Sequence, residues 1–287
     1  MKVITWNVNS LRSRLPRLRA LLERESPDIV CLQETKVSDP DFPSLALGQA
    51  GYQVVSHGLG GSAGVAILSK QSAQAAEPGF VGDPLPDQAR VVAATVGGIR
   101  VVSVYVINGG SLDDPAYQAE LEWLDAFTAW LKSSHDPRTP LIVAGDFNVA
   151  PDDRDVHDPS AWTGRIHVSE AERARIRSLF DWGLVDLLRV KTVLPGFHTW
   201  WDYRAGAFHR GWGLRIDLIL ATRPVAELCT EVHIDRNERR PTAGEGKPSD
   251  HAPVIAELRF LGSHRQGTEG PGVDDVSSAS WDVSDRS

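Results

Sequence analysis

Polar residues suited to metal and phosphate chemistry end five apolar segments of this sequence. The segments are residues 3–7, 29–34, 141–148, 214–217 and 248–251, and their polar members are Asn7, Glu34, Asp146, Asn148, Asp217, Asp250 and His251. Carboxylate and amide oxygens are the ligands that Mg²⁺ and Mn²⁺ prefer, and Mg²⁺ needs only one or two carboxylates beside a substrate phosphate. The sequence therefore predicts a divalent-metal site that acts on a phosphodiester.

Each of these residues also has an ordinary structural interpretation. Asp146 could stand in a turn, Asn7 could cap a helix, Asp250 could cap a helix or pair with Lys247, and His251 could be a surface histidine or a core histidine with its hydrogen bonds satisfied. Their joint occurrence at the ends of apolar strands favours a shared site.

Asp146 and Asn148 are two positions apart. Side chains at that spacing face the same way on extended backbone, so we expect both to meet one substrate.

The elements that position these residues are short strands and amphipathic helices. Eight apolar, β-branched runs predict strands at residues 3–6, 29–32, 65–68, 91–96, 101–107, 141–144, 216–220 and 254–258. Helices are predicted at residues 117–131, at residues 15–25 with Pro16 in the first turn, and after Ser169, which begins a capping box and a helix that ends at Gly183. The irregular alternation predicts a layered α/β sandwich of two sheets.

Charge and composition exclude several classes of protein. The 287 residues are 41% hydrophobic and carry a formal charge of -8, which excludes a wholly disordered chain and a generally basic nucleic-acid binder. Cys31 and Cys229 each lie in an apolar run, so we expect free thiols in a reducing compartment. The sequence shows neither a secretory signal nor an apolar run of the roughly 20 residues that span a bilayer, and we expect a soluble cytoplasmic protein.

Composition changes near the end of the chain. Residues 262–287 contain four Gly, six Ser, five acidic and two basic residues and show no apolar periodicity. We expect one folded domain over residues 1–261 and a disordered tail over residues 262–287.

Six motifs in order along residues 1 to 260 make the chain resemble the exonuclease III family of AP endonucleases. They are TWNVNSLR (5–12), LQETK (32–36), GDFN (145–148), WWDYR (200–204), GLRID (213–217) and KPSDHAP (247–253). The resemblance implies a DNase I-like fold, a four-layered α/β sandwich of two mixed sheets flanked by helices. It also implies Mg²⁺-dependent hydrolysis of the phosphodiester on the 5′ side of an abasic site, which leaves a 3′-hydroxyl, together with 3′–5′ exonuclease and 3′-end-cleaning activity.

The resemblance also assigns roles at matching positions. Glu34 is expected to hold the metal, and further ligands are expected from Asn7, Asp146, Asn148 and Asp250. Asp146 matches the proton acceptor for the attacking water, and Asn148 matches the residue that orients that water or donates to the oxyanion.

Two further residues are expected to act on the phosphate. His251 would donate to a non-bridging oxygen while Asp217 orients its ring. Tyr105 resembles the family's catalytic tyrosine, although Ile107 stands where proline is usual.

Contacts with DNA are also implied by the resemblance. Trp200, Leu214 and Ile216 match an apolar pocket that accepts a flipped-out sugar without a base, and Arg90 matches a phosphate contact. Arg215, close to a strand end, is expected to meet DNA phosphate as well. The expected partner is duplex DNA with abasic sites or blocked 3′ ends, no membrane is expected, and the protein is expected to be a monomer that uses Mg²⁺ or, in its place, Mn²⁺.

Two alternatives remain open from the sequence. A phosphomonoesterase or lipid phosphodiesterase of the same superfamily would need a cluster of Lys and Arg, whereas the matched pocket is apolar. A binding module without catalysis would lack a ligand or base, whereas all matched polar positions are present. The charge also agrees with a nuclease, because the predicted tail holds -3 and the four acids Glu34, Asp146, Asp217 and Asp250 account for most of the remaining -5.

Overall fold

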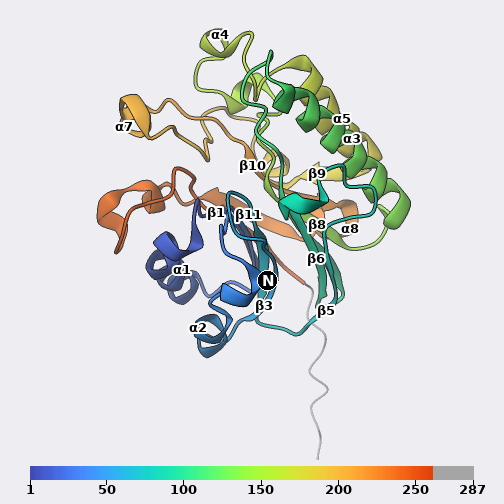
Figure 1. Ribbon diagram of the computed structural model, residues 1–287, viewed down its shortest axis with the longest axis vertical. Coiled ribbons are helices and arrows are strands. Elements are labelled where there is room, and N and C mark those ends of the chain that lie inside the picture. Colours follow the sequence, from blue (N-terminus) through green and yellow to red (C-terminus); the bar gives the residue numbers. More distant parts are fainter. Residues whose placement is uncertain (261–287) are drawn as a thin grey trace, which may run out of the picture.

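Two six-stranded β-sheets pack face to face, and helices cover the outer face of each sheet (Figure 1). The structure is a computed structural model and describes residues 1–260. The predicted boundary at residue 261 and the predicted tail over residues 262–287 lie outside the described residues. The four-layered sandwich expected from the sequence is confirmed.

The first sheet has the strand order β11-β12-β1-β2-β4-β3, and the second has the order β5-β6-β7-β8-β10-β9. β1 with β2 and β7 with β8 are parallel pairs, and the other neighbours are antiparallel. The strands of the first sheet are β1 (Lys2–Asn7), β2 (Ile29–Gln33), β3 (Gln53–His57), β4 (Val65–Ser69), β11 (Cys229–Ile234) and β12 (Val254–Leu258). Those of the second are β5 (Ala73–Pro78), β6 (Val91–Val96), β7 (Ile99–Tyr105), β8 (Leu141–Asp146), β9 (Leu184–Asp186) and β10 (Asp217–Thr222).

The helices are α1 (Leu11–Glu25), α2 (Ser44–Gln49), α3 (Pro115–Ser134), α4 (Pro159–Trp162), α5 (Glu170–Trp182), α6 (Leu187–Lys191), α7 (Ala207–Arg210) and α8 (Arg223–Ala226). Short 3₁₀ turns lie at η1 (Asp39–Asp41), η2 (Pro86–Gln88), η3 (Asp153–Asp155), η4 (Arg204–Gly206), η5 (Arg236–Arg239) and η6 (Pro241–Ala243). No helix within residues 1–260 is both long enough and apolar enough to cross a bilayer.

Local sequence explains where the long helices begin. Asp114 caps α3 by accepting from the backbone N–H of Ala116, and Ser169 with Glu172 forms the predicted capping box of α5. The prediction for α1 is wrong at its start, because this helix begins at Leu11 and Pro16 lies in its interior. Ser10, the residue before the helix, has a φ of 88° and makes no side-chain capping hydrogen bond, so no cap marks this start.

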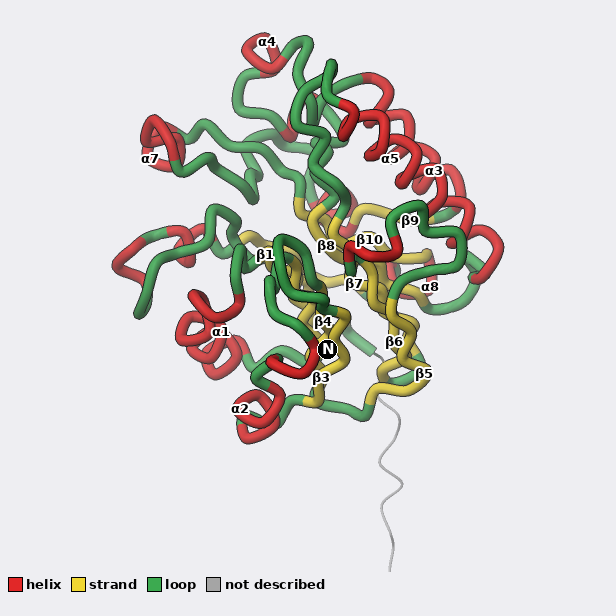
Figure 2. The backbone as a smooth tube through the Cα atoms, viewed as in Figure 1, coloured by secondary structure: helices red, strands yellow, loops and turns green. Residues whose placement is uncertain are grey.

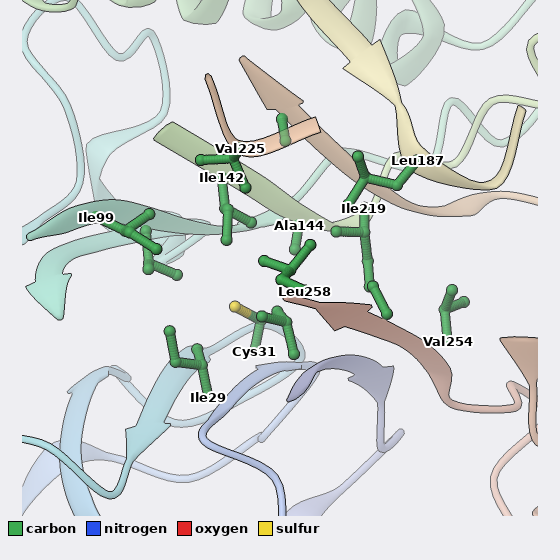
Figure 3. Packing of buried hydrophobic residues seen from close by; sticks show 14 of the residues in the cluster. Ile29, Cys31, Ile99, Ile142, Ala144, Leu187, Ile219, Val225, Val254 and Leu258 are labelled. Carbon is green, nitrogen blue, oxygen red and sulfur yellow. The ribbon is translucent and has the colours of Figure 1, made fainter. Parts of the chain in front are cut away.

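Three apolar clusters hold the layers together. The largest lies between the sheets and includes Cys31, Ile142 and Ile219, whose side chains converge in Figure 3. A second packs the outer face of β6, β7, β8 and β10 against α3 and α5. A third packs the first sheet against α1 and α2. Both cysteines are buried free thiols, as predicted.

Strand direction brings the predicted site residues to one edge of the sandwich. Because β1 and β2 are parallel, Asn7 at the end of β1 and Glu34 just after β2 lie at the same edge. His251 lies there too, shortly before β12 begins and runs antiparallel to β1. In the second sheet Asp146 is the register partner of both Tyr105 and Asp217. Figure 2 shows the long loops that carry α4 and α7 rising from this side of the sheets.

Candidate active site

Asn7 links the two sheets where their strands end. Its Nδ2 donates to Glu34 Oε1 and to Asp146 Oδ2, each at 2.8 Å. Its Oδ1 accepts from the backbone N–H of Asn9 at 2.9 Å. Asn7 thus bridges two carboxylates through its amide nitrogen, and its role as an oxygen ligand of a metal stays a prediction.

Asp217, His251 and Asp146 form a buried line of charged groups. His251 Nδ1 donates to Asp217 Oδ2 at 2.9 Å, and His251 Nε2 lies 3.8 Å from Asp146 Oδ2. Thr199 Oγ1 accepts from the backbone N–H of Asp217 at 3.1 Å, which fixes the start of β10 beside the imidazole. The ring is therefore oriented by Asp217 and presents its other nitrogen toward Asp146.

The line also sets the protonation of its members. Burial raises the pKa of Asp146 to about 7, and the nearby charge of Asp217 adds to this rise. Burial by itself lowers the pKa of His251, but the charges of Asp217 and then Asp146 outweigh it and raise this pKa to about 10. At neutral pH His251 is thus a cation that can donate from Nε2, and Asp146 is poised to exchange a proton.

Glu34 and Asp146 are the groups that fit a divalent cation. Together with His251 they present ligand-type atoms within 4.8 Å of one another. His251 Nδ1 is bonded to Asp217, so this ring fits a hydrogen-bond donor better than a metal ligand. Two hard carboxylates remain, and this donor set suits Mg²⁺ or Mn²⁺. Lys36 Nζ lies 2.9 Å from Glu34 Oε2, so the protein itself places a cation at this carboxylate.

Asp250 lies apart from this carboxylate pair. Its Oδ1 accepts from Asn9 Nδ2 at 2.9 Å, and its Oδ2 accepts from Trp200 Nε1 at 3.1 Å. Burial raises the pKa of Asp250, but the charge of His251 and these two hydrogen bonds outweigh it and hold the pKa below the usual value. Asp250 remains ionised at neutral pH and ties Trp200 to the site.

Asn148 departs from the geometry expected of it. Its φ is 52°, in the left-handed region, so the chain is not extended from Asp146 through Asn148 and the same-face argument fails. The backbone N–H of Asn148 donates to Asp146 Oδ1 at 2.9 Å. The side-chain amide donates to Val106 O at 2.9 Å and accepts from Asn108 Nδ2 at 3.3 Å. Asn148 therefore orients Asp146 through its backbone.

Tyr105 and Arg90 form a pair beside Asp146. The Arg90 guanidinium lies 4.8 Å from the centre of the Tyr105 ring and donates to Tyr105 O at 3.2 Å. Burial, with the charges of Glu34 and Asp146, raises the pKa of Tyr105 well above its ordinary value, so the phenol keeps its proton. Arg90 is 9% exposed and supports Tyr105, and its contact with DNA phosphate stays a prediction.

The expectation that Arg215 contacts DNA is wrong. Arg215 is 1% exposed, and its Nε and Nη2 donate to Asp155 at 2.6 and 3.2 Å. Nη2 also donates to Asp186 at 2.7 Å, while Arg189 donates to Asp155 from the other side. Nε and Nη2 of the guanidinium therefore belong to a buried ion network beside the start of β10.

A cleft of about 750 Å³ adjoins the site. Of the three predicted pocket residues only Trp200 lines it, because Leu214 and Ile216 are 0% and 2% exposed and pack beneath it. The rest of the wall near Trp200 includes Trp162 and His167, with ring centres 6.5 and 6.0 Å from the Trp200 ring. Aromatic rings thus line this part of the cleft, where the resemblance implied the aliphatic side chains of Leu214 and Ile216 beside Trp200.

Half of the non-glycine residues with positive φ within residues 1–260 lie at this site or close to it. Asn9, Glu34, Lys36, Asn148 and His167 all have φ between 42° and 72°. Residues other than glycine adopt this region at a cost and do so mainly where the surrounding structure enforces it, which is common at functional sites.

Comparison with known proteins assigns the chain to a family. The sequence profile of the Endonuclease/Exonuclease/phosphatase family matches residues 4–251. The chain belongs to this family. Exodeoxyribonuclease III of Haemophilus influenzae is 35% identical over 271 residues, which cover 90% of this chain and all of that protein.

Solved structures of this family agree. A 3′ phosphatase from Neisseria bound to a product DNA hairpin has a TM-score of 0.86 at 42% identity, and it covers 91% of this chain and all of that one. An AP endonuclease from Archaeoglobus fulgidus has a TM-score of 0.84 at 38% identity over the same shares. The expected enzyme class, a nuclease of the exonuclease III type, is confirmed.

Three residues that hold the site together were not predicted from the sequence. Asn9 holds Asp250, Thr199 holds Asp217, and His167 Nδ1 bonds Asn148 O. Asn9 lies inside the TWNVNSLR motif, so a signal was present. Thr199 and His167 lie outside the motifs, and only the folded geometry brings them to the site.

Proposed function

We propose that this enzyme is a DNA-repair nuclease that hydrolyses the phosphodiester on the 5′ side of abasic sites in duplex DNA and leaves a 3′-hydroxyl. The observation that carries the proposal is the buried line Asp217–His251–Asp146 beside Glu34. It combines a proton acceptor, a fixed cationic donor and a pair of carboxylates, which are the groups that phosphodiester hydrolysis requires.

Asp146 would take the proton of the attacking water, since its raised pKa of about 7 makes it a base matched to neutral pH. His251 would donate from Nε2 to a non-bridging phosphate oxygen, and Asp217 keeps the ring charged and oriented. Tyr105, whose phenol keeps its proton, would donate a second hydrogen bond to the phosphate. Asn148 would steady Asp146 through its backbone N–H.

We propose Mg²⁺ as the cofactor, held by Glu34 and Asp146, with Mn²⁺ able to replace it. When bound, such an ion polarises a phosphoryl oxygen and stabilises charge on the leaving oxygen. The two carboxylates supply hard oxygen atoms. Asn7 holds both carboxylates in place by hydrogen bonds, and Lys36 pairs with Glu34.

A second activity, removal of 3′-terminal phosphates and nucleotides, is proposed for the same site. It is supported by the 42% and 41% identical structures, which are described as a 3′ phosphatase and a 3′–5′ exonuclease from Neisseria. The same carboxylates and His251 could act on a phosphate at a 3′ end. We further propose that the enzyme works as a monomer, since all the groups named come from one chain. We also propose that it works in the cytoplasm, because exodeoxyribonuclease III of a bacterium is among its relatives.

The test is cleavage of three labelled duplexes by the purified protein with Mg²⁺ or Mn²⁺. They carry a tetrahydrofuran abasic analogue, a 3′-phosphate at a nick, or no lesion. We expect incision of the first and dephosphorylation of the second, and EDTA should abolish both. Failure to cut the abasic duplex with either metal would contradict the endonuclease proposal, and failure on the second would contradict the phosphatase proposal.

Asp146→Asn tests the assigned base. We expect it to lose turnover by about 100-fold or more while DNA binding is retained, because the amide cannot accept a proton. Asp181→Asn, an exposed acid on α5, is the matched control and should cut at the wild-type rate. An Asp146→Asn enzyme with wild-type turnover would remove Asp146 from the mechanism.

A further inference from the structure

Two tryptophans that line the cleft each carry an arginine. Trp162 ends α4, and the Arg165 guanidinium lies 5.7 Å from its ring centre. Trp212 follows α7, and the Arg210 guanidinium lies 4.5 Å from its ring centre. Figure 1 shows α4 and α7 on separate loops above the site edge. The same pairing of a flat ring with a cation therefore occurs at two places on the cleft.

Both arginines are free to meet another charge. Within residues 1–260 neither side chain of Arg165 and Arg210 makes an ion pair or a hydrogen bond. Arg204, which lines the same cleft, is by contrast held by Asp202 at 2.7 and 3.0 Å. A guanidinium that lies over an aromatic ring and makes no ion pair can move to a phosphate at a small cost in free energy.

Trp212 is exposed yet firmly placed. Its side chain is 43% exposed. Its backbone N–H donates to Ala207 O at 2.9 Å, and the ring of His157 stacks at 6.3 Å with an angle of 25°. His157 is itself fixed, because its backbone N–H donates to Gly213 O at 3.1 Å. A large apolar ring that is exposed to water beside a cleft indicates a surface that a ligand covers.

The cleft also connects these rings to the reaction centre. Its inner wall includes Trp200, which donates to Asp250, and Asn108, which donates to Asn148. A volume of about 750 Å³ lies within the range of pockets for nucleotide-sized ligands and exceeds what a sugar without a base needs. A strand that places its phosphate at Asp146 can thus extend its next nucleotide along the cleft.

We propose that Trp212 and Trp162, with Arg210 and Arg165, form a stacking site for an unpaired base of the substrate DNA next to the scissile nucleotide. The inference rests on the proposed DNA substrate. Aromatic rings that stack on bases and free cations that meet the backbone are the combination by which proteins hold single-stranded nucleic acid. The site makes the enzyme prefer substrates in which the base beside the lesion or the 3′ end is unpaired.

The test uses duplexes with 2-aminopurine placed on either side of an abasic analogue, and binding is measured in EDTA so that no cleavage occurs. We expect fluorescence to change at one flanking position when the wild-type protein binds. Trp212→Ala should abolish this change and weaken binding about tenfold, and Trp212→Phe should retain both. Leu45→Ala, which removes an exposed apolar side chain on α2 outside the cleft, should leave both unchanged.

Arg210→Ala provides a second, independent measurement. We expect it to keep the 2-aminopurine signal and to reduce the salt dependence of binding by about one phosphate contact. If Trp212→Ala binds like the wild type and gives the wild-type signal at both positions, the inference is overturned while cleavage by the wild type still supports the proposed function. If the wild type neither binds nor cuts DNA, both are overturned. If Trp212→Ala melts at a lower temperature than the wild type, its loss of binding could reflect unfolding, and the results for Trp212→Phe and Arg210→Ala then test the inference.

Discussion

At the scale of single residues, His251 depends on Asp217 for both its position and its charge. Asp217 accepts from Nδ1 at 2.9 Å, and its charge is the largest of the influences that raise the pKa of His251 to about 10. A neutral residue in place of Asp217 would remove that influence and leave the opposing effect of burial. His251 would then hold its proton only at lower pH.

Asp217→Asn is therefore predicted to make catalysis depend on pH. Because the pKa of His251 falls, the protonated form that donates to phosphate is lost as pH rises through the neutral range. We expect turnover on abasic DNA to fall about 100-fold at pH 8 and much less at pH 6. The measurement is the pH profile of kcat for variant and wild type. Asp136→Asn, in an exposed pair with Arg138, is the control, and parallel profiles for Asp217→Asn and wild type would contradict the assignment.

Residue types predicted the acids and the histidine of the site better than its cations. Glu34, Asp146, Asp217 and His251 came together as the motifs indicated, while Asp250 lies apart and holds Asn9 and Trp200. Arg215 did not reach a DNA-facing surface, since Asp155 and Asp186 bury it, and the ring of Tyr105 covers much of Arg90. The partners of Arg215 lie 60 and 29 positions away, so no local pattern could reveal that its charge was already used.

At the scale of elements, the close approach of β7 and β8 positions Asp146. A Cβ atom added to Gly145 would lie 1.9 Å from Val104 O, so any side chain here must push the strands apart. Asp146 is the next residue along β8 and the register partner of Tyr105 on β7. Glycine is therefore required one position before the assigned base.

Gly145→Ala is predicted to lower both stability and activity. We expect the melting temperature to fall and turnover to drop at least tenfold, because the shift of β8 moves Asp146 away from His251. Gly48→Ala is the matched control, since a Cβ at Gly48 in α2 meets nothing within 4 Å, and it should leave activity unchanged. Thermal melting and the abasic-site assay measure the two effects, and a Gly145→Ala enzyme as active as Gly48→Ala would show that the strand spacing does not control Asp146.

The strands that sequence patterns missed share one property. All eight predicted strands are present, and the four that were missed, β3, β5, β9 and β11, are the outer strands of the two sheets. Inner strands are buried on both faces and so read as continuous β-branched runs. Edge strands such as β5, whose residues are mostly exposed, carry Gln, Glu and Ala and give no such run. The inner strands carry the site, which explains why its position was predictable.

At the scale of the whole molecule, net charge is a poor guide to the partner. The chain carries -8, and several arginines that appear in this count are buried among residues 1–260, including Arg17, Arg90 and Arg215. The free cations identified at the cleft are Arg165 and Arg210. Attraction to DNA must therefore come from a local patch, and binding should weaken with salt in proportion to the few phosphates that this patch meets.

A buried acid outside the reaction line also makes the stability of the whole fold depend on pH. Glu120, on α3, is 0% exposed, and no side chain within residues 1–260 pairs with its carboxyl group. Burial and the charge of Glu172 raise its pKa to about 9, while the backbone N–H of Gly109 and the charge of Arg175 oppose the rise. The folded protein thus keeps this proton at neutral pH, whereas the unfolded chain releases it above its ordinary pKa near 4.5.

Glu120→Gln is predicted to stabilise the protein increasingly as pH rises. Between the unfolded and folded pKa values the unfolded state binds fewer protons, so the contribution of Glu120 to the free energy of unfolding falls with pH, by about 3 kcal/mol from pH 5 to pH 7. Glutamine cannot ionise and escapes this loss. Denaturant unfolding at both pH values should show a stability difference between variant and wild type that grows by an amount of this order. Glu122→Gln, exposed on the same helix, should show no such growth. A difference that stays constant across this range would contradict the prediction. It would mean that Glu120, which lies next to Gly109, is ionised in the folded protein at neutral pH.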